Sequence, residues 1–330
     1  MGAADDRDAA PAAAAWHAGE RATQARAGAL ERMAQLGPHV MRPYMPEQHR
    51  ELFEKLPFML LGALDARRRP WAALLVGAPG FVRTPDAQTL AIGARPLGAD
   101  ALALDLDDGA PVGLLGIEPA TRRRNRVNGV VMASHAAGFG VRVQQSFGNC
   151  PKYIQAREPR FVGAAPGAPV AFEALLPPAA RAQIERADTF FIASAAADAG
   201  QPGQAANGGV DVSHRGGKPG FVRVDGAQGR SVLTAPDFVG NSFFNTLGNI
   251  AANPRAGLLF IDWTNGDLLA LTGAAEVQWD GAELQSFAGA QRLLKLRVDE
   301  GRWLPGVVPL RAEEVDYAAQ LGETGSWVPT

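Results

Sequence analysis

The sequence contains a single cysteine, Cys150, in 330 residues. One cysteine excludes an intramolecular disulfide, a CxxC motif and a thiolate zinc site, and it is typical of a reducing compartment. The five histidines occur in neither an HExxH nor an HxH spacing, so a metal site would need ligands from distant segments. No apolar run approaches the roughly 20 residues of a membrane span. The first residues also lack the basic start and apolar core of a signal peptide. We therefore expect a cytoplasmic protein that binds neither metal nor membrane.

An excess of charge of one sign is also missing. The 32 basic residues nearly cancel the 34 acidic ones, for a net charge of -2. This balance argues against a nucleic-acid partner or an anionic membrane surface. The usual nucleotide-binding loops are absent too: no GxGxxG follows a strand, and Gly217-Lys218 lacks the leading glycine and the following Ser or Thr of a P-loop. The sequence argues against NAD in a Rossmann site and ATP in a Walker site.

Glycine and proline, in contrast, are abundant, with 38 and 24 residues. This surplus shows no collagen-like period and is typical of many turns between many short strands. Apolar residues make up 47% and charged residues 20%, which is enough for a sizeable core. The length fits two domains.

The same series of features occurs twice along the chain in the same order, as expected of an internal repeat. The matched features are a helical stretch after Pro46 and Pro178, apolar runs from Phe58 and Phe190, the pentapeptide PGFVR at 79–83 and 219–223, strands from Gly113 and Gly257, and then Gly129 and Gly273. The offset between the copies grows from 132 to 140 to 144, as insertions require. The eight-residue step falls on the flexible composition of 195–209.

Each copy is predicted to be a helix followed by about six strands with one short helical crossover. In the second copy the crossover is NSFFNTLGNIAANP (241–254), capped by Asn241 or Ser242, and in the first it is the weaker DALALDLDD (100–108). Many short strands with few helices favour small antiparallel barrels over a doubly wound parallel sheet. We expect a fold that is mainly β with short helices (α+β).

The repeat divides the chain into five parts. These are an N-terminal helical extension at 1–45, a first barrel at 46–156, a linker at 157–177, a second barrel at 178–311 and a C-terminal tail at 312–330. Within the extension we expect a helix over 18–36 that Gly37-Pro38 ends and that packs on a barrel.

Polar residues gather at the end of one predicted strand and at the start of the next helix. Ser213, His214 and Arg215 precede Gly216 and Gly217, where a phosphate could meet a guanidinium, a hydroxyl and free backbone amides. A Gly-Asn-Ser helix start follows the next strand, and helix N-termini attract anions. Together they predict a phosphate pocket. The alternative from spacing alone is that 213–217 is only a turn and Asn241 only an N-cap.

The stretch 233–262 resembles the core of the pyridoxamine 5'-phosphate oxidase-like FMN-binding split barrels: a strand, a Pro-Asp turn, a helix ending in Asn-Pro-Arg-Ala and an apolar strand. The resemblance covers about 46–155 and 178–280. The stretches RRRNRVNG (122–129) and QSFGNCPKYIQAR (145–157) are similar to a bacterial subgroup of flavin-nucleotide-binding proteins. The resemblance implies two tandem split barrels that form an intramolecular pseudo-dimer, with FMN held non-covalently in the cleft between them.

The resemblance also implies the cofactor-binding residues. Arg215 would pair with the FMN phosphate, beside Ser213, His214 and the amides of Gly216 and Gly217. Asp237, Asn241, Asn245 and Thr246 would face it from the crossover, and Gln145, Ser146, Asn149, Cys150 and Lys152 would meet the polar edge of the isoalloxazine from the other barrel. The phosphate-binding Ser and Lys of the oxidases are replaced by Phe244 and Thr246. Their C-terminal substrate motif has no clear counterpart in 297–312, so we do not predict pyridoxamine phosphate oxidation.

Three features carry open alternatives. The run Arg122, Arg123, Arg124 and Arg126 is interpreted as a solvated face, with a bound FMN or substrate anion, or a nucleic acid, as alternatives; on a strand at most half of these side chains point one way. Cys150 is interpreted as a buried inert thiol rather than a reactive one. His214 is interpreted as a turn histidine rather than a general acid or flavin ligand.

The functional hypothesis is an FMN-dependent oxidoreductase acting on a small-molecule electron donor or acceptor, with no catalytic side chain identified. One alternative is a flavin carrier or sensing protein without turnover. Another is a haem-binding split barrel with His135 or His214 as axial ligand. The protein would be a monomeric pseudo-dimer or a homodimer.

Overall fold

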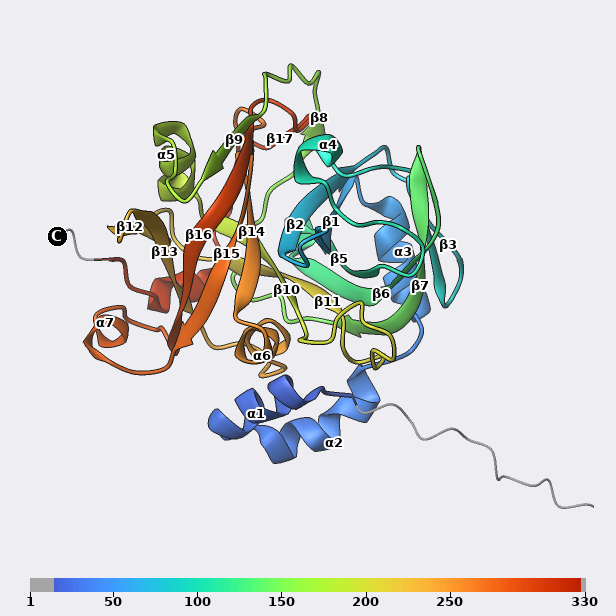
Figure 1. Ribbon diagram of the computed structural model, residues 1–330, viewed down its shortest axis with the longest axis horizontal. Coiled ribbons are helices and arrows are strands. Elements are labelled where there is room, and N and C mark those ends of the chain that lie inside the picture. Colours follow the sequence, from blue (N-terminus) through green and yellow to red (C-terminus); the bar gives the residue numbers. More distant parts are fainter. Residues whose placement is uncertain (1–14, 328–330) are drawn as a thin grey trace, which may run out of the picture.

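A computed structural model describes residues 15–327 and contains two large antiparallel sheets side by side (Figure 1). The first sheet has the strand order β2-β1-β5-β6-β7-β4-β3 and the second the order β11-β10-β14-β15-β16-β13-β12, with β9 added on β16. All pairs in both sheets are antiparallel. The predicted fold class, mainly β with short helices in two barrels, is confirmed.

The first unit contains α3 (Glu47–Lys55), β1 (Phe58–Leu64), β2 (Pro70–Val76), β3 (Val82–Asp86), β4 (Thr89–Ile92), α4 (Ala99–Leu102), β5 (Pro111–Glu118), a 3-10 turn (Pro119–Thr121), β6 (Arg123–His135) and β7 (Gly138–Gly148). The second unit contains β9 (Val170–Glu173), α5 (Pro178–Arg186), β10 (Thr189–Ala195), β11 (Val210–Gly216), β12 (Arg223–Ala227), β13 (Arg230–Asp237), α6 (Asn245–Ala252), β14 (Arg255–Ile261), β15 (Leu268–Gln278), α7 (Ala282–Gln285) and β16 (Arg292–Leu304). The remaining elements are α1 (Ala18–Arg26), α2 (Leu30–Val40), β8 (Arg160–Phe161), β17 (Leu310–Arg311) and a 3-10 turn (Ala319–Glu323).

The internal repeat is visible in the strand order, which is the same in both sheets once the strands are renumbered. The matched glycines Gly129 and Gly273 both lie at a register shift in the ladder between the two longest strands. The pairing of the strands shows that the first offset between the two copies, counted from their apolar runs, is too large by one residue. Gly62 lies opposite Gly113, and Ala193 lies opposite Gly257, so Gly62 corresponds to Ala193 and not to Ser194. The extra residues of the second unit fall in the loop 196–209, as expected.

Each unit begins upstream of its first helix with a segment that pairs with its own last long strand. Arg42 bridges Ser146 of β7, and Phe172 of β9 lies opposite Gly301 of β16. The segment 157–177, which the composition presents as a linker, thus contains β9 and the short β8, which pairs with β17. The domain bounds themselves stay a prediction.

The N-terminal extension is helical but forms two helices, α1 and α2, instead of one. The chain turns between them at Gly28, whose φ of 67° is a conformation that glycine adopts without strain. The expectation that Gly37-Pro38 ends the helix is wrong, because α2 continues through Pro38 to Val40 and Met41 still donates to the Gly37 carbonyl. Among the helices of residues 15–327, none combines the length and apolar character of a membrane span.

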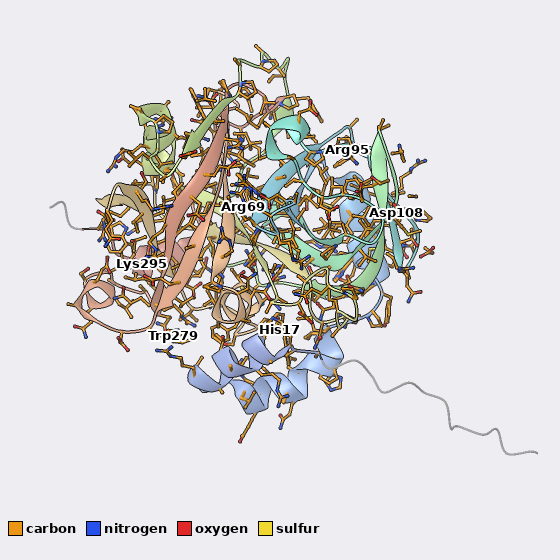
Figure 2. All side chains as sticks on the ribbon, in the orientation of Figure 1. His17, Arg69, Arg95, Asp108, Trp279 and Lys295 are labelled. Carbon is orange, nitrogen blue, oxygen red and sulfur yellow. The ribbon has the colours of Figure 1, made fainter. Side chains whose placement is uncertain are left out.

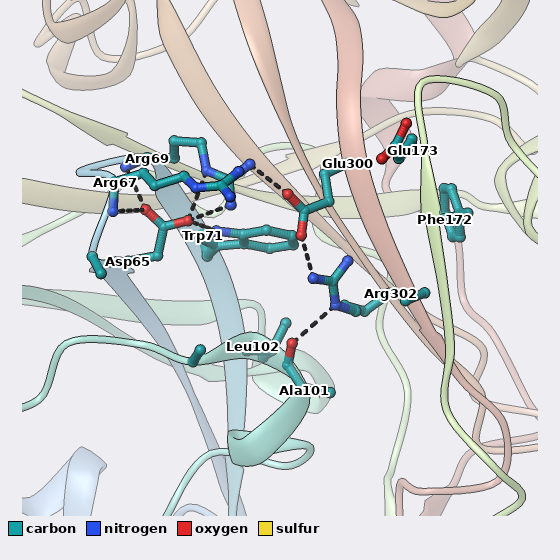
Figure 3. Close-up of a pocket in the computed structure, with 13 residues that line it drawn as sticks. Asp65, Arg67, Arg69, Trp71, Ala101, Leu102, Phe172, Glu173, Glu300 and Arg302 are labelled. Atoms are coloured by element: carbon teal, nitrogen blue, oxygen red, sulfur yellow. Dashed lines mark hydrogen bonds and ion pairs between the residues drawn. The ribbon is translucent and has the colours of Figure 1, made fainter.

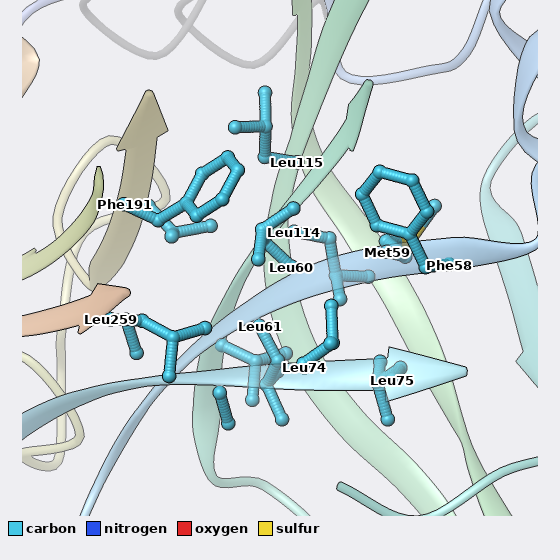
Figure 4. Packing of buried hydrophobic residues seen from close by; sticks show 14 of the residues in the cluster. Phe58, Met59, Leu60, Leu61, Leu74, Leu75, Leu114, Leu115, Phe191 and Leu259 are labelled. Carbon is cyan, nitrogen blue, oxygen red and sulfur yellow. The ribbon is translucent and has the colours of Figure 1, made fainter. Parts of the chain in front are cut away.

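One large hydrophobic cluster includes residues of both units (Figure 4). Phe58, Leu60 and Leu114 of the first unit pack with Phe191 and Leu259 of the second. The backbones approach closely where the matched glycines face the other unit. A Cβ on Gly113 would lie 2.8 Å from the Cα of Asp211, and a Cβ on Gly257 would lie 2.6 Å from the Cα of Trp71. The two units are therefore packed as one body.

Candidate functional site

A polar cavity of about 220 Å³ lies between the two units. Its walls are the start of β6 and the end of β7 from the first unit, and the end of β11, the loop 237–244 and the first turn of α6 from the second. Nine of the predicted residues line it: Asn149, Cys150, Ser213, His214, Arg215, Asp237, Asn241, Asn245 and Thr246. The structure thus brings together residues from both units, as the resemblance implies.

Five predicted residues do not line this cavity. Ser146 is fully buried and contacts His49 at 2.9 Å, and Gln145 donates to the Ala15 carbonyl at 3.4 Å. Lys152 lies outside the lining. The expectation of a free amide at Gly217 is wrong, because Gly217 donates its N–H to the Asp188 carbonyl at 2.9 Å. Gly216 lies opposite Thr189 in the next, non-hydrogen-bonded pair of the β10–β11 ladder, so its N–H points away from β10.

Arg126 anchors the deep end of the cavity. Its Nη1 donates to both carboxylate oxygens of Asp211, at 2.8 and 2.9 Å, and its Nη2 donates to Ser213. The Ser213 hydroxyl lies 2.7 Å from that of Thr246 at the start of α6. Arg126 and Asp211 are both over nine-tenths buried, so this pair joins the two units inside the cleft.

Arg215 and Arg292 share the carboxylate of Asp237. Asp237 lies 2.8 Å from Arg215 Nη1 and 3.2 Å from Arg292 Nε. The Arg292 guanidinium also lies against two aromatic rings, 5.0 Å from the centroid of Phe244 and 4.9 Å from that of Trp279. Such cation–π contacts hold a guanidinium in place without using its N–H groups.

Arg124 has no carboxylate partner in the cavity. Its Nε donates to the Cys150 carbonyl at 2.9 Å and its Nη1 to His214 Nδ1 at 3.0 Å. Burial lowers the pKa of Arg124 to about 10, with the neighbouring Arg126 and Arg215 acting in the same direction. Burial, Arg124, Arg215 and Arg157 hold the pKa of His214 well below its ordinary value, so this imidazole is neutral at pH 7 and accepts through Nδ1.

The sequence-based interpretation placed three residues of this cavity elsewhere or missed them. They are Arg124, Arg126 and Arg292. A solvated face is wrong for Arg124 and Arg126, which point from β6 into the cleft. Their i, i+2 spacing on one strand is the feature that indicates a common face. Nothing local distinguishes Arg292, which reaches the cavity because β16 pairs with β13 and Arg292 lies opposite Asp237.

Several buried N–H groups at the cavity have no hydrogen-bond partner among the described residues. They are Arg126 Nε, Arg215 Nε, Arg292 Nη1 and Asn149 Nδ2. Buried donors are normally paired, and an unpaired buried guanidinium is costly. Four guanidinium groups face only two carboxyl groups here, those of Asp211 and Asp237. This donor set fits a bound oxyanion.

The mouth of the cavity is formed by two strained loops. Tyr153, Ser242 and Phe244 have φ values of 62°, 65° and 61°, which L residues rarely adopt. The loops are joined by a hydrogen bond from Asn241 Nδ2 to Asn149 Oδ1 at 3.1 Å. Strain of this kind concentrates at functional sites.

The predicted cap of the crossover helix is wrong. The N-cap of α6 is Phe244, without a side-chain hydrogen bond. Asn241 instead accepts from the Phe243 amide at 3.1 Å and forms a turn before the helix. Phe244 has a left-handed backbone conformation, and its ring lies against the Arg292 guanidinium.

Helix α1 packs against α6 and lies beneath it in the view of Figure 1. Glu20 of α1 accepts from Asn245 Nδ2 at 2.5 Å and from the His17 amide at 2.9 Å. Burial raises the pKa of Glu20 to about 8, so the carboxyl is mostly protonated at pH 7. Figure 2 shows His17 and Trp279 on the side of the molecule where α1 lies, and the Arg26 guanidinium of α1 lies 4.7 Å from the Trp279 ring.

A larger cavity of about 560 Å³ lies elsewhere between the units (Figure 3). Four of its charged side chains are paired with one another: Arg69 contacts Asp65 at 2.7 Å and Glu300 at 2.5 Å, and Glu300 also binds Arg302. Arg302 in turn donates to the Ala101 carbonyl at 2.9 Å. Because Arg69 belongs to the first unit and Glu300 to the second, this network is an ionic clamp between the units. Within residues 15–327, no group of His, Cys, Asp and Glu side chains could hold a metal ion.

No protein-family model matches the sequence, and no curated protein matches it. Among solved structures, HupZ of Group A Streptococcus is similar at 12% identity over 47% of this chain and all of its own, with a TM-score of 0.28. A putative pyridoxamine 5'-phosphate oxidase from Lactobacillus delbrueckii matches at 16% identity over 39% of this chain and 98% of its own, with a TM-score of 0.27. The heme storage protein HutZ of Vibrio cholerae matches at 14% identity over 40% and 96%, with a TM-score of 0.25. The second of these is named for the oxidases that the sequence resembles. None of these similarities carries a function to this chain, and the two-barrel architecture rests on its own strand order and register.

Proposed function

We propose that the protein is an FMN-binding flavoprotein and that it acts as an oxidoreductase on a small molecule. The observation that carries this proposal is the cavity between the barrels, which is lined by four guanidinium groups. Several of the buried N–H donors there have no hydrogen-bond partner among the described residues. A phosphate is the group that such a set of donors binds best. The sequence resemblance to FMN-binding split barrels points to the same ligand.

The residues present fit the phosphate end of FMN. Arg215, Arg292 and Arg124 surround the cavity, and the Ser213 and Thr246 hydroxyls lie at its deep end. The cavity is smaller than the roughly 300 to 1,000 Å³ of pockets for drug-sized ligands, so the rest of the ligand would extend toward the mouth. Asn149 lies there with an unpartnered Nδ2. When bound, FMN would supply the ring that exchanges electrons with a substrate, while the protein binds and orients it.

The absorption spectrum of the purified protein tests the cofactor. We expect flavin bands, with FMN released into the supernatant when the protein is denatured. A Soret band would identify a haem-binding barrel instead, and a colourless protein that added FMN does not bind would reject the proposal. Rapid anaerobic bleaching by NADH or NADPH supports an oxidoreductase, whereas a bound flavin that no donor reduces favours a carrier or sensor.

The arginine pocket is tested by substitution. Arg215→Ala is expected to weaken FMN binding by at least about 1.5 to 3 kcal/mol, the contribution of a hydrogen bond to a charged group. Arg297→Ala is the matched control, since Arg297 is exposed on β16 and lies outside the cavity. Equal affinity in the Arg215 variant and the control, measured by fluorescence titration, would place the phosphate elsewhere.

A further inference from the structure

The internal repeat gives the residues of the polar cavity that lie on β6 and β11 counterparts in the other unit. Val212 lies opposite Ala193 in the β10–β11 ladder, and Ala72 lies opposite Gly62 in the β1–β2 ladder. Because Ala193 and Gly62 correspond, Val212 corresponds to Ala72. The strands β11 and β2 therefore match residue by residue from this point.

The same reasoning matches β6 with β15. Asn128 lies opposite Gly113 in the first unit, and Thr272 lies opposite Gly257 in the second. Counting two and four residues back, Arg126 corresponds to Ala270 and Arg124 to Leu268. A second cleft, related to the first by the repeat, is thus defined by β2 and β15.

This second cleft has lost the polar groups. Ser213, His214 and Arg215 correspond to Ala73, Leu74 and Leu75, and Asp211 corresponds to Trp71. All of these counterparts, with Leu268 and Ala270, are at most 1% exposed. These counterparts all belong to one hydrophobic cluster, which includes residues of both units. The space that forms an arginine pocket in one cleft is core in the other.

The charges in the polar cleft define the ligand that it takes. Arg124, Arg126, Arg215 and Arg292 are opposed by Asp211 and Asp237. His214 is uncharged and Glu20 is mostly protonated at pH 7. Two positive charges remain without a counterion in a buried place, which is costly unless a ligand neutralises them. A phosphate monoester carries close to two negative charges at this pH.

We infer that each chain binds one dianionic phosphate monoester, in the polar cleft alone, and that the cleft related to it by the repeat has become part of the core. The inference deepens the proposed function, because FMN is such a monoester. It goes beyond the proposed function in two ways. It sets the stoichiometry at one ligand per chain, and it applies to any ligand that has a phosphate monoester group.

Titration of the full-length protein with methyl phosphate, dimethyl phosphate and FMN tests the inference by calorimetry. We expect one site per chain for methyl phosphate and at least about tenfold weaker binding of dimethyl phosphate, which carries a single charge. Two sites per chain, or equal affinities for the two phosphates, would overturn it. Binding of neither phosphate would overturn it as well.

Variants locate the site and separate the inference from the proposed function. Arg215→Met and Arg124→Met are each expected to weaken methyl phosphate binding more than tenfold at the single site, while Arg297→Ala leaves it unchanged. A variant that keeps a full-affinity site would overturn the inference, because that site would not depend on the arginines of the polar cleft. If methyl phosphate binds once per chain with this dependence and FMN does not bind, the inference stands and the FMN proposal fails.

Discussion

At the scale of single residues, the pair of Arg126 and Asp211 links the ligand cavity to the stability of the fold. Both side chains are buried, and each is the other's closest opposite charge, at 2.8 Å. Removing one partner of a buried pair leaves a charge without compensation, which costs more than the pair itself contributes.

Arg126→Met is therefore expected to lower the free energy of unfolding by about 3 to 5 kcal/mol. The double variant, Arg126→Met with Asp211→Asn, is expected to recover part of this loss, because no charge is left unpaired. Urea unfolding of the wild type, both single variants and the double variant measures the coupling. Strictly additive effects would show that the two side chains do not interact.

The residues of the site differ in whether a local sequence pattern is enough to predict them. Ser213 and Arg215 could be predicted because they alternate on a strand that ends beside two glycines. Arg292 could not, because its place depends on the pairing of β16 with β13. The inward direction of Arg124 and Arg126 could not either, since arginines turn toward a cleft only if a second unit forms the other wall.

At the scale of elements, helix α1 shows what an extension can add to a repeated fold. The sequence predicts a helix that packs on a barrel but does not show that its acidic residue, Glu20, contacts Asn245 of the site. Glu20 reaches Asn245 because Gly19 and Gly248 let α1 and α6 approach closely; a Cβ on Gly248 would lie 2.6 Å from the Glu20 backbone. His17, Asp211 and Arg126 are the charged or titratable groups around it.

This burial makes the docking of α1 sensitive to pH. The pKa of Glu20 is raised from 4.5 to about 8, so the folded state holds a proton that the unfolded state releases. The stabilisation by this proton is complete below pH 4.5 and is lost as the pH rises toward 8, by up to about 1.4 kcal/mol per pH unit.

Glu20→Gln cannot titrate, so its stability should depend less on pH over this range than that of the wild type. Urea unfolding at half-unit intervals from pH 5 to 8.5 compares the two slopes. Parallel curves would mean that Glu20 does not carry a buried proton.

At the scale of the whole molecule, the two units depend on close backbone contact at Gly113 and Gly257. These glycines occupy matched positions. Gly113 faces β11 of the second unit and Gly257 faces β2 of the first, and β11 and β2 are themselves corresponding strands. The sequence identifies the repeat from such glycines. It does not show that they form the interface, because that depends on how the two sheets pack against each other.

Gly113→Ala and Gly257→Ala are each expected to destabilise the protein by about 1 to 3 kcal/mol, the usual cost of overpacking. Gly226→Ala is the matched control, since a Cβ on this strand glycine would meet no atom within 4 Å. Thermal and urea unfolding measure the differences. Variants as stable as the control would indicate that the units can separate slightly without cost.

The covalent link between the two barrels has a genetic consequence. In a dimer of identical subunits, one codon specifies the residue in both related clefts, so a change that benefits one cleft is imposed on the other. In this chain, Leu75 and Arg215 are encoded separately although they hold corresponding positions. Each can therefore be selected for a different task, one for packing and one for charge, and a mutation that damages packing at one position need not alter ligand recognition at the other.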